Sequence, residues 1–202
     1  DRVTRAKAKA ALVKAKREQT KIEDSNDDAS KSDEKESPFV NNTVQKVSAS
    51  LEKKFPGALD GEQNSDWIQL KPKNWFEIAN WLKDDSDFYF DSLQCNTGFD
   101  LGEGNLESRY NFHSMKHLHS IEIRIKVSVE KPDIPSVESI WRVADWFERE
   151  TYDMFGINFT GHSDLRRILL PEDWEGWPLR KDYKEQETYH GIVVPKVKEG
   201  WE

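Results

Sequence analysis

The pattern of hydrophobic and polar positions divides the chain into three parts. Few large apolar side chains precede residue 42, and all eight tryptophans lie from Trp67 onward. The middle part has apolar residues at the spacings of helices and strands, whereas no regular period persists beyond Gly161. The pattern therefore predicts a charged, disordered or loosely helical tail, one folded domain and an extended C-terminal docking segment, over residues 1–41, 42–160 and 161–202.

The clearest strand runs from His119 to Val129, where isoleucine and valine alternate with charged or polar residues. This alternation is typical of an antiparallel strand with one buried and one solvent-facing side. Arg109–His113 is expected to pair with it through a hairpin around Ser114–Lys116. Two shorter strands are predicted at Trp67–Leu70 and Phe88–Cys95. The three glycines of Gly98–Asn105 predict a turn.

Three helices are predicted from apolar residues at helical spacing. The first carries Val44, Val47, Leu51 and Phe55 and ends at Pro56-Gly57. The second follows Asn74 as its N-cap and carries Trp75, Ile78, Ala79 and Leu82. The third begins at Ser136 and ends before Gly156, with an apolar stripe of Ile140, Val143, Ala144, Phe147, Thr151 and Met154. The opposite side of this third helix is expected to be solvated and carries Arg142, Asp145, Arg149 and Asp153.

These elements predict an α+β fold with a small, mostly antiparallel sheet and flanking helices. The formal net charge of −8 argues against nucleic acid as the main partner, because phosphate binding needs a basic surface. No apolar run approaches the roughly 20 residues that span a bilayer, so membrane association is expected only through other proteins. The tail is basic over residues 1–21 and acidic over 22–37, and its composition favours a solvated tail over an interaction arm.

The sequence offers no cofactor site that depends on several cysteines or on a glycine-rich loop. Cys95 is the only cysteine, whereas an iron–sulfur cluster needs about four thiolate or histidine ligands. Gly98, Gly102 and Gly104 lack dinucleotide-fingerprint spacing, and Walker and Gly-x-Ser-x-Gly motifs are absent. We therefore expect neither a cofactor nor a metal in this chain.

Two polar clusters are candidates for chemistry. His113, His117 and His119 lie across a predicted hairpin, but no cysteine is near them, so structural roles are favoured over metal binding. Glu148, Glu150 and Asp153 point in different directions on one helix, which favours a solvated or partner-facing charge ladder over paired catalytic carboxylates. No catalytic residue is predicted.

The C-terminal third carries long runs that resemble a known family. They are WRVADWFERETYDMFGI at 141–157, GHSDLRRILLP at 161–171 and DWEGWPLRKDY at 173–183. These runs resemble the C subunit, or 30 kDa subunit family, of the proton-pumping NADH:quinone oxidoreductase, respiratory complex I. Ser163 stands where the family often has proline, and Trp177 where it commonly has histidine or tyrosine.

The resemblance implies a structural subunit without a redox centre, in the hydrophilic arm of a complex whose FMN and iron–sulfur clusters lie in partner subunits. It implies contact with the quinone-site (D) subunit and proximity to the B and I subunits. It also implies a peripheral location on the cytoplasmic face of a bacterial inner membrane, or on the matrix face in mitochondria. The signature residues expected at subunit interfaces are Glu148, Arg149, Glu150, Asp153, His162, Arg166, Arg167, Trp174, Trp177, Arg180 and Lys181.

Within Gly161–Tyr183, the apolar and arginine-rich composition predicts the principal docking segment. Trp174 and Trp177 are expected to face outward, with Arg180 and Lys181 pairing with acids of the quinone-site subunit. Two alternatives stay open at this point. One is the equivalent subunit of a membrane-bound hydrogenase or a ferredoxin-type quinone reductase, and the other is a free-standing binding module.

Overall fold

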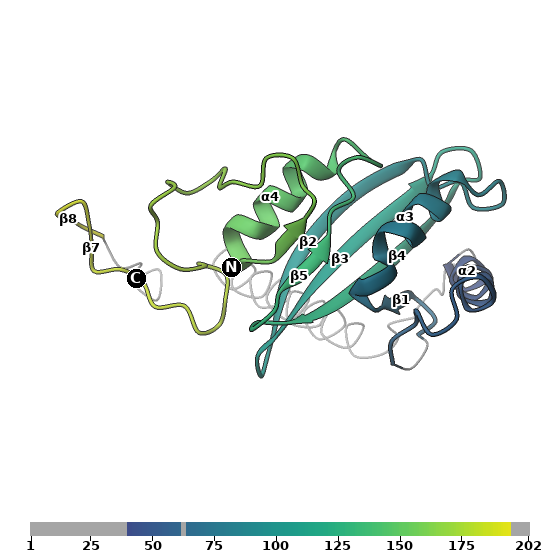
Figure 1. Ribbon diagram of the computed structural model, residues 1–202, viewed down its shortest axis with the longest axis horizontal. Coiled ribbons are helices and arrows are strands. Elements are labelled where there is room, and N and C mark those ends of the chain that lie inside the picture. Colours follow the sequence, from purple (N-terminus) through teal and green to yellow (C-terminus); the bar gives the residue numbers. More distant parts are fainter. Residues whose placement is uncertain (1–39, 62–63, 195–202) are drawn as a thin grey trace, which may run out of the picture. The chain divides into compact units, whose positions relative to one another are not determined.

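A four-stranded sheet in the order β1-β4-β3-β2 forms the centre of the fold (Figure 1). A computed structural model describes residues 40–61 and 64–194, so nearly all of the tail expected over residues 1–41 lies outside the described residues. The sheet strands are β1 (Trp67–Leu70), β2 (Ser92–Gly102), β3 (Asn105–Ser114) and β4 (His119–Ser128). Strand β1 lies parallel to β4, and the other neighbours are antiparallel. The predicted α+β class with a mostly antiparallel sheet is thus confirmed.

The hairpin of β3 and β4 is continuous, with residues paired from Asn105↔Ser128 to Ser114↔His119. The side of the sheet that carries Ile121, Ile123, Ile125 and Val127 is buried, as the alternating pattern predicted. Strand β4 therefore forms where β-branched residues alternate with polar ones.

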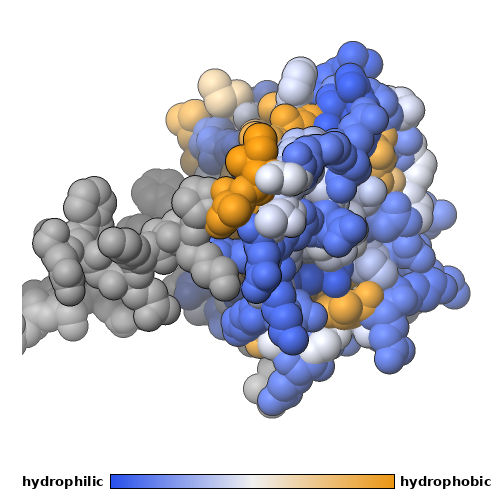
Figure 2. Space-filling model, turned by 90° about the vertical axis from the view of Figure 1, so that its left-hand side faces the viewer, coloured by the Kyte–Doolittle hydropathy of each residue, from blue (hydrophilic) through white to orange (hydrophobic). Residues whose placement is uncertain are grey.

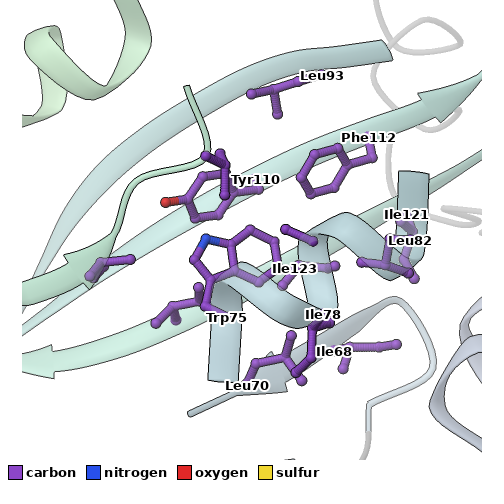
Figure 3. Packing of buried hydrophobic residues seen from close by; sticks show 14 of the residues in the cluster. Ile68, Leu70, Trp75, Ile78, Leu82, Leu93, Tyr110, Phe112, Ile121 and Ile123 are labelled. Atoms are coloured by element: carbon purple, nitrogen blue, oxygen red, sulfur yellow. The ribbon is translucent and has the colours of Figure 1, made fainter. Parts of the chain in front are cut away.

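Helices cover this side of the sheet. They are α2 (Val40–Lys54), α3 (Trp75–Asp84), which continues the 3-10 turn η1 (Pro72–Asn74), and α4 (Ala144–Phe155). In Figure 3, Trp75 of α3 lies against Tyr110 of β3, and their ring centroids are 4.8 Å apart. The predicted helices over α2 and α3 are confirmed, although the Asn74 side chain makes no capping hydrogen bond.

Two expectations about β2 are wrong. The strand begins at Ser92 rather than Phe88, and Gly98 lies inside it rather than in a turn. Only Glu103 and Gly104 separate β2 from β3, with φ of 53° and 74°. A Cβ at position 98 would lie 2.5 Å from Cδ2 of Phe155. Only glycine at this position of the strand therefore lets α4 approach the sheet.

The third helix is also shorter than predicted. Helix α4 starts at Ala144, and the expected start at Ser136 falls instead at the end of β5 (Asp133–Pro135), which pairs in parallel with β6 (Asn158–Thr160). The backbone N–H of Ser136 donates to the carbonyl of Thr160, so this region follows β6 rather than a helix. The predicted helix end is confirmed, because Gly156 closes α4 in a left-handed conformation.

The described part of the C-terminal segment is mostly irregular, as predicted, and contains the two-residue strands β7 (Thr188–Tyr189) and β8 (Ile192–Val193). Within the part of the chain that the structure describes, no helix is long and apolar enough to cross a membrane.

Candidate functional site

Asp153, on the last turns of α4, receives hydrogen bonds from the backbone of the C-terminal segment. Its Oδ2 accepts the N–H groups of Ile168, Leu169 and Leu170 at 3.0, 2.7 and 3.0 Å. Its Oδ1 accepts from Nη1 of Arg167 at 2.7 Å. Burial alone would raise the pKa of this carboxyl, but the hydrogen bonds outweigh burial and lower it. Asp153 is therefore the point at which the segment is fixed to α4.

Arg167 extends this connection to the following turn. Its Nη2 donates to the carbonyls of Trp174 and Gly176 at 3.0 and 2.8 Å. The guanidinium carbon also lies 4.5 Å from the ring centroid of Trp177. One arginine thus satisfies the backbone of a turn that has no regular secondary structure.

The expectation that Trp174 and Trp177 face outward is wrong, because both are half-buried. The Trp177 ring packs edge-on against Tyr152 of α4, with centroids 5.2 Å apart. The Trp174 indole donates to the hydroxyl of Tyr183 at 3.1 Å. Arg180 donates to the carbonyl of Phe155 at 2.5 Å, so it too binds the end of α4.

Lys181 is linked to the sheet through its backbone. Its N–H donates to Oδ2 of Asp100 at 2.8 Å, while its side chain is exposed. The expected pairing of Arg180 and Lys181 with acids of another subunit stays a prediction.

Glu148 is a buried carboxyl between α4 and the chain that precedes it. Its Oε2 accepts from the hydroxyl of Ser136 at 2.5 Å, and its Oε1 accepts from the N–H of Val137 at 2.8 Å. Burial, only partly opposed by these two bonds, raises the pKa of Glu148 from 4.5 to about 7. The charge ladder expected on this helix is therefore not solvated at Glu148.

His162 lies beside this carboxyl with a fully buried side chain. Its Nδ1 accepts the N–H of Asp164 at 3.0 Å, so a neutral ring carries its proton on Nε2. That nitrogen lies 3.3 Å from the carbonyl of Asp145 and 4.0 Å from Oε2 of Glu148. His162 thus connects β6 and the loop after it to the first turns of α4.

The assignment of Arg149 to the solvated side is also wrong, since only 7% of it is exposed. Its Nη1 lies 3.8 Å from Oδ1 of Asp145, and its guanidinium carbon lies 5.2 Å from the Trp146 ring centroid. Glu150 and Arg166 are exposed, and Arg166 pairs with Asp164 at 2.9 Å. The signature residues that connect the segment to α4 thus include Asp153, His162, Arg167, Trp177 and Arg180.

The side chains that do face outward are different ones. Four large apolar residues of this region are exposed by 41–60%: Val143, Trp146, Leu169 and Leu179. Figure 2 shows this side of the molecule, where the surface is largely polar and hydrophobic residues are exposed in separate groups. Trp146 follows Val143 by one helical turn, and this spacing could have indicated that both side chains face the same way. The predicted apolar stripe had instead placed Val143 toward the core.

The three histidines of the hairpin each have a protein partner. His117 and His119 contact the carbonyls of Ser86 and Phe88 at 2.9 and 2.8 Å, and His113 contacts the hydroxyl of Ser120. Within the described ranges 40–61 and 64–194, no group of three or more histidine, cysteine or acidic side chains is arranged to hold a metal ion.

The fold and these contacts define an α+β module in which the signature residues join α4 to a long C-terminal segment. A family model described as "Respiratory-chain NADH dehydrogenase, 30 Kd subunit" matches residues 68–189. The chain belongs to this family, as the resemblance of its C-terminal third predicted.

Similar proteins agree with this assignment. The chain is 52% identical over 122 residues to the C subunit of NADH-quinone oxidoreductase from Chloroherpeton thalassium, covering 60% of this chain and 51% of that protein. It thus spans about half the length of that relative. It is 45% identical over 141 residues to the corresponding subunit of Chlorobium phaeobacteroides, covering 68% of this chain and 85% of the relative.

Solved structures agree on the fold. A chain of the membrane-bound sulfane sulfur reductase, an archaeal respiratory membrane complex, superposes with a TM-score of 0.58 at 19% identity. The match covers 70% of this chain and 86% of that one. At this identity the likeness concerns the fold alone.

Proposed function

We propose that this chain is a structural subunit, without catalytic residues, of the hydrophilic arm of an NADH:quinone oxidoreductase. In such a complex, NADH reduces FMN in another subunit, and iron–sulfur clusters in further subunits carry electrons to quinone, coupled to proton translocation. The supporting observation is that the signature residues Asp153 and Arg167 are used to hold the segment against α4. A side chain already saturated by such contacts is suited to shaping a docking surface rather than to proton or electron transfer.

The proposed partners are the D, B and I subunits, with the quinone-site (D) subunit at the outer surface of α4 and the C-terminal segment. The exposed Trp146 and Leu169 are the proposed anchors, because tryptophan is enriched where binding energy concentrates and Leu169 adds exposed apolar surface on the segment. Attachment to the membrane would be indirect, on the cytoplasmic face in bacteria or the matrix face in mitochondria.

Assembly of the complex tests this proposal. Trp146→Ala with Leu169→Ala, introduced into the full chain in its native host, is expected to lower the amount of assembled complex on native gels. The melting temperature of the purified variant should stay within a few degrees of wild type, because exposed side chains contribute little to folding. Quinone reductase activity per assembled complex should be unchanged.

A matched control removes two equally exposed apolar residues elsewhere. Met115→Ala with Leu118→Ala lies at the β3–β4 hairpin tip, where the residues are 64% and 73% exposed. Normal assembly of this control with loss in the α4 variant supports the proposal. Normal assembly of both variants would reject the anchors, and normal assembly with lost turnover per complex would reject a purely structural role.

The electron donor is tested on the same purified complex. Curated relatives include NADH-quinone oxidoreductase subunits and the J subunit of an NAD(P)H-quinone oxidoreductase from Prochlorococcus marinus, 44% identical over 130 residues. We therefore expect quinone reduction with NADH. Reduction only with hydrogen or reduced ferredoxin would favour the hydrogenase or ferredoxin-type alternative.

A further inference from the structure

A pocket lies at the end of β4, where the sheet loses one of its neighbours. Strand β1 is four residues long and its last residue, Leu70, pairs with Ile125. Beyond this point β4 continues to Ser128, and among the described residues no strand pairs with it on that side, because Pro72 begins η1 and turns the chain away. Strand β5 follows in the sequence and lies next to η1 and β4. The result is a cavity of about 530 Å³ between η1, β4 and β5.

The walls of this cavity carry an excess of positive charge. Lys73, Lys126 and Lys131 line it, against the single carboxylate of Asp133. Within the described parts of the chain, none of the three ammonium groups has a hydrogen-bond or ion-pair partner. Asp133 is itself engaged, since its Oδ1 accepts from the amide of Asn158 at 2.6 Å. Two positive charges are thus left without compensation in a chain whose net charge is −8.

The rest of the lining suits an organic molecule. Pro72, Val127 and Pro135 provide apolar surface, and the hydroxyls of Ser128 and Thr160 provide hydrogen-bond donors. The volume falls in the range of small-molecule sites, roughly 300–1,000 Å³, which combine apolar walls with a few polar groups. It is too small for a folded protein element.

We propose that this pocket binds a small organic phosphate, with its phosphate group among Lys73, Lys126 and Lys131 and its apolar part against the two prolines. A phosphate monoester carries about −1.5 to −2 charges at neutral pH, which matches the two uncompensated positive charges. A single carboxylate would neutralise only one of them. Lysine is also a common phosphate ligand, acting as a point charge with rotatable donors. The proposal does not depend on the chain's role in a respiratory complex.

The test uses the full chain and three probes measured by titration calorimetry in phosphate-free buffer at low salt. The probes are phenyl phosphate, benzoate, which has the same ring and one charge, and inorganic phosphate, which has no apolar part. Phenyl phosphate is expected to bind with one-to-one stoichiometry and more tightly than either of the others. Absence of saturable binding, or equal binding of benzoate, would overturn the proposal.

Variants locate the binding. Lys73→Gln, Lys126→Gln and Lys131→Gln combined should weaken phenyl phosphate binding by at least about tenfold, because each ammonium contributes a charge-assisted contact. The control combines Lys46→Gln, Lys53→Gln and Lys116→Gln, which removes the same charge from exposed lysines outside the pocket. The control should bind as wild type does. Equal weakening in both would mean that general surface charge attracts the probe, and the site would be rejected.

A safeguard is needed in case the triple variant does not fold. Melting temperatures are compared first, and if the triple variant unfolds, the single variants Lys126→Gln and Lys131→Gln replace it. Each is expected to weaken binding by about threefold or more, which is the partial loss expected when one of several charged contacts is removed. Unchanged binding in both single variants would overturn the assignment.

Discussion

Asp153 of α4 and Arg167 of the C-terminal segment form an ion pair with Nη1 and Oδ1 2.7 Å apart, and their side chains are only 0% and 9% exposed. The same carboxylate accepts three successive backbone N–H groups. A surface ion pair contributes little to stability, but removal of one partner from a buried pair leaves the other charge without compensation. The attachment of the segment should therefore depend on this pair more than on any hydrophobic contact.

The first prediction follows for Asp153→Asn. This change removes the charge but keeps the shape, and it should lower the free energy of unfolding by roughly 3–5 kcal/mol because Arg167 stays buried without its partner. Urea denaturation measures the loss, and faster trypsin cleavage after Arg166 or Arg167 reports release of the segment. Asp164→Asn, in an exposed pair with Arg166, is the control and should behave as wild type. Equal effects of the two substitutions would contradict the proposed role of Asp153.

The second prediction concerns pH and Glu148. Because the folded pKa is raised from 4.5 to about 7, the folded state retains a proton that the unfolded chain releases between these values. The free energy of unfolding should therefore fall as pH rises through this window, by roughly 3 kcal/mol in total, and level off above it. Glu148→Gln keeps the hydrogen-bond geometry without the titration, so its stability should vary much less with pH.

The control for this prediction is Glu150→Gln, two residues along the same helix and exposed. It should retain the wild-type pH dependence, measured by urea denaturation at half-unit steps. Asp145, Glu138 and His162 face the same buried carboxyl and are unchanged in both variants, so the comparison isolates Glu148. Superimposable profiles for wild type and Glu148→Gln would show that this carboxyl is not the source of the pH dependence of stability.

The third prediction tests the closeness of the segment to α4 at Gly156. Alanine there meets two costs: a left-handed backbone with φ of 71°, and a Cβ 2.5 Å from the Trp177 ring. Gly104→Ala meets only the first, because its φ is 74° and nothing lies within 4 Å. The control should cost about 1–2 kcal/mol, and Gly156→Ala clearly more. Thermal unfolding would compare them.

Adding Trp177→Ala to each glycine variant separates the clash from the backbone strain. If the ring causes the excess cost, the double variant at Gly156 should lose less stability than the sum of its single changes. The Gly104 double variant should be additive. Additivity in both would mean that Trp177 does not pack against Gly156.

The fourth prediction compares two arginines near the start of α4. Arg149→Ala should lower the free energy of unfolding by about 1–3 kcal/mol, because its stem is buried and its guanidinium accompanies Asp145 and Trp146. Arg142→Ala, at an exposed position, should change it by less than about 0.5 kcal/mol. Urea denaturation measures both changes. A larger loss of stability for Arg142→Ala than for Arg149→Ala would contradict the assignment of Arg149 to the buried side and Arg142 to the exposed side.

The elements whose positions the sequence predicted well each bury only one side. Strand β4 alternates strictly, and α2 repeats its apolar residues at helical spacing, so the local pattern is enough to define both. The start of β2 was missed because Phe88 and Phe90 are buried in a loop, where hydrophobicity does not imply a strand. Gly98 was wrongly predicted to lie in a turn, because this position needs glycine to make room for Phe155, which is far away in the sequence.

The prediction that the polar side of α4 is solvated was wrong for a related reason. Glu148, Arg149 and Asp153 have the composition of a solvated helix face, and nothing local distinguishes them from one. The hydrogen-bond partners of Glu148 and Asp153 lie 11 to 17 residues away, at Val137 and at Ile168–Leu170 among others. Family resemblance marked these residues as important but assigned them to subunit interfaces, whereas their contacts here are internal. The interface itself remains a prediction.

The hydrogen bonds of Asp153 also limit how the sequence can change length. Because three consecutive N–H groups meet one oxygen, a single inserted or deleted residue within 167–170 would present the wrong amides and displace Arg167 from its carboxylate. The loop from Gly161 to Arg166 contains no carboxylate that receives consecutive N–H groups, although His162, Ser163 and the carbonyl of Arg166 are hydrogen-bonded. Variation in length should therefore be tolerated just before the anchored residues and excluded within them.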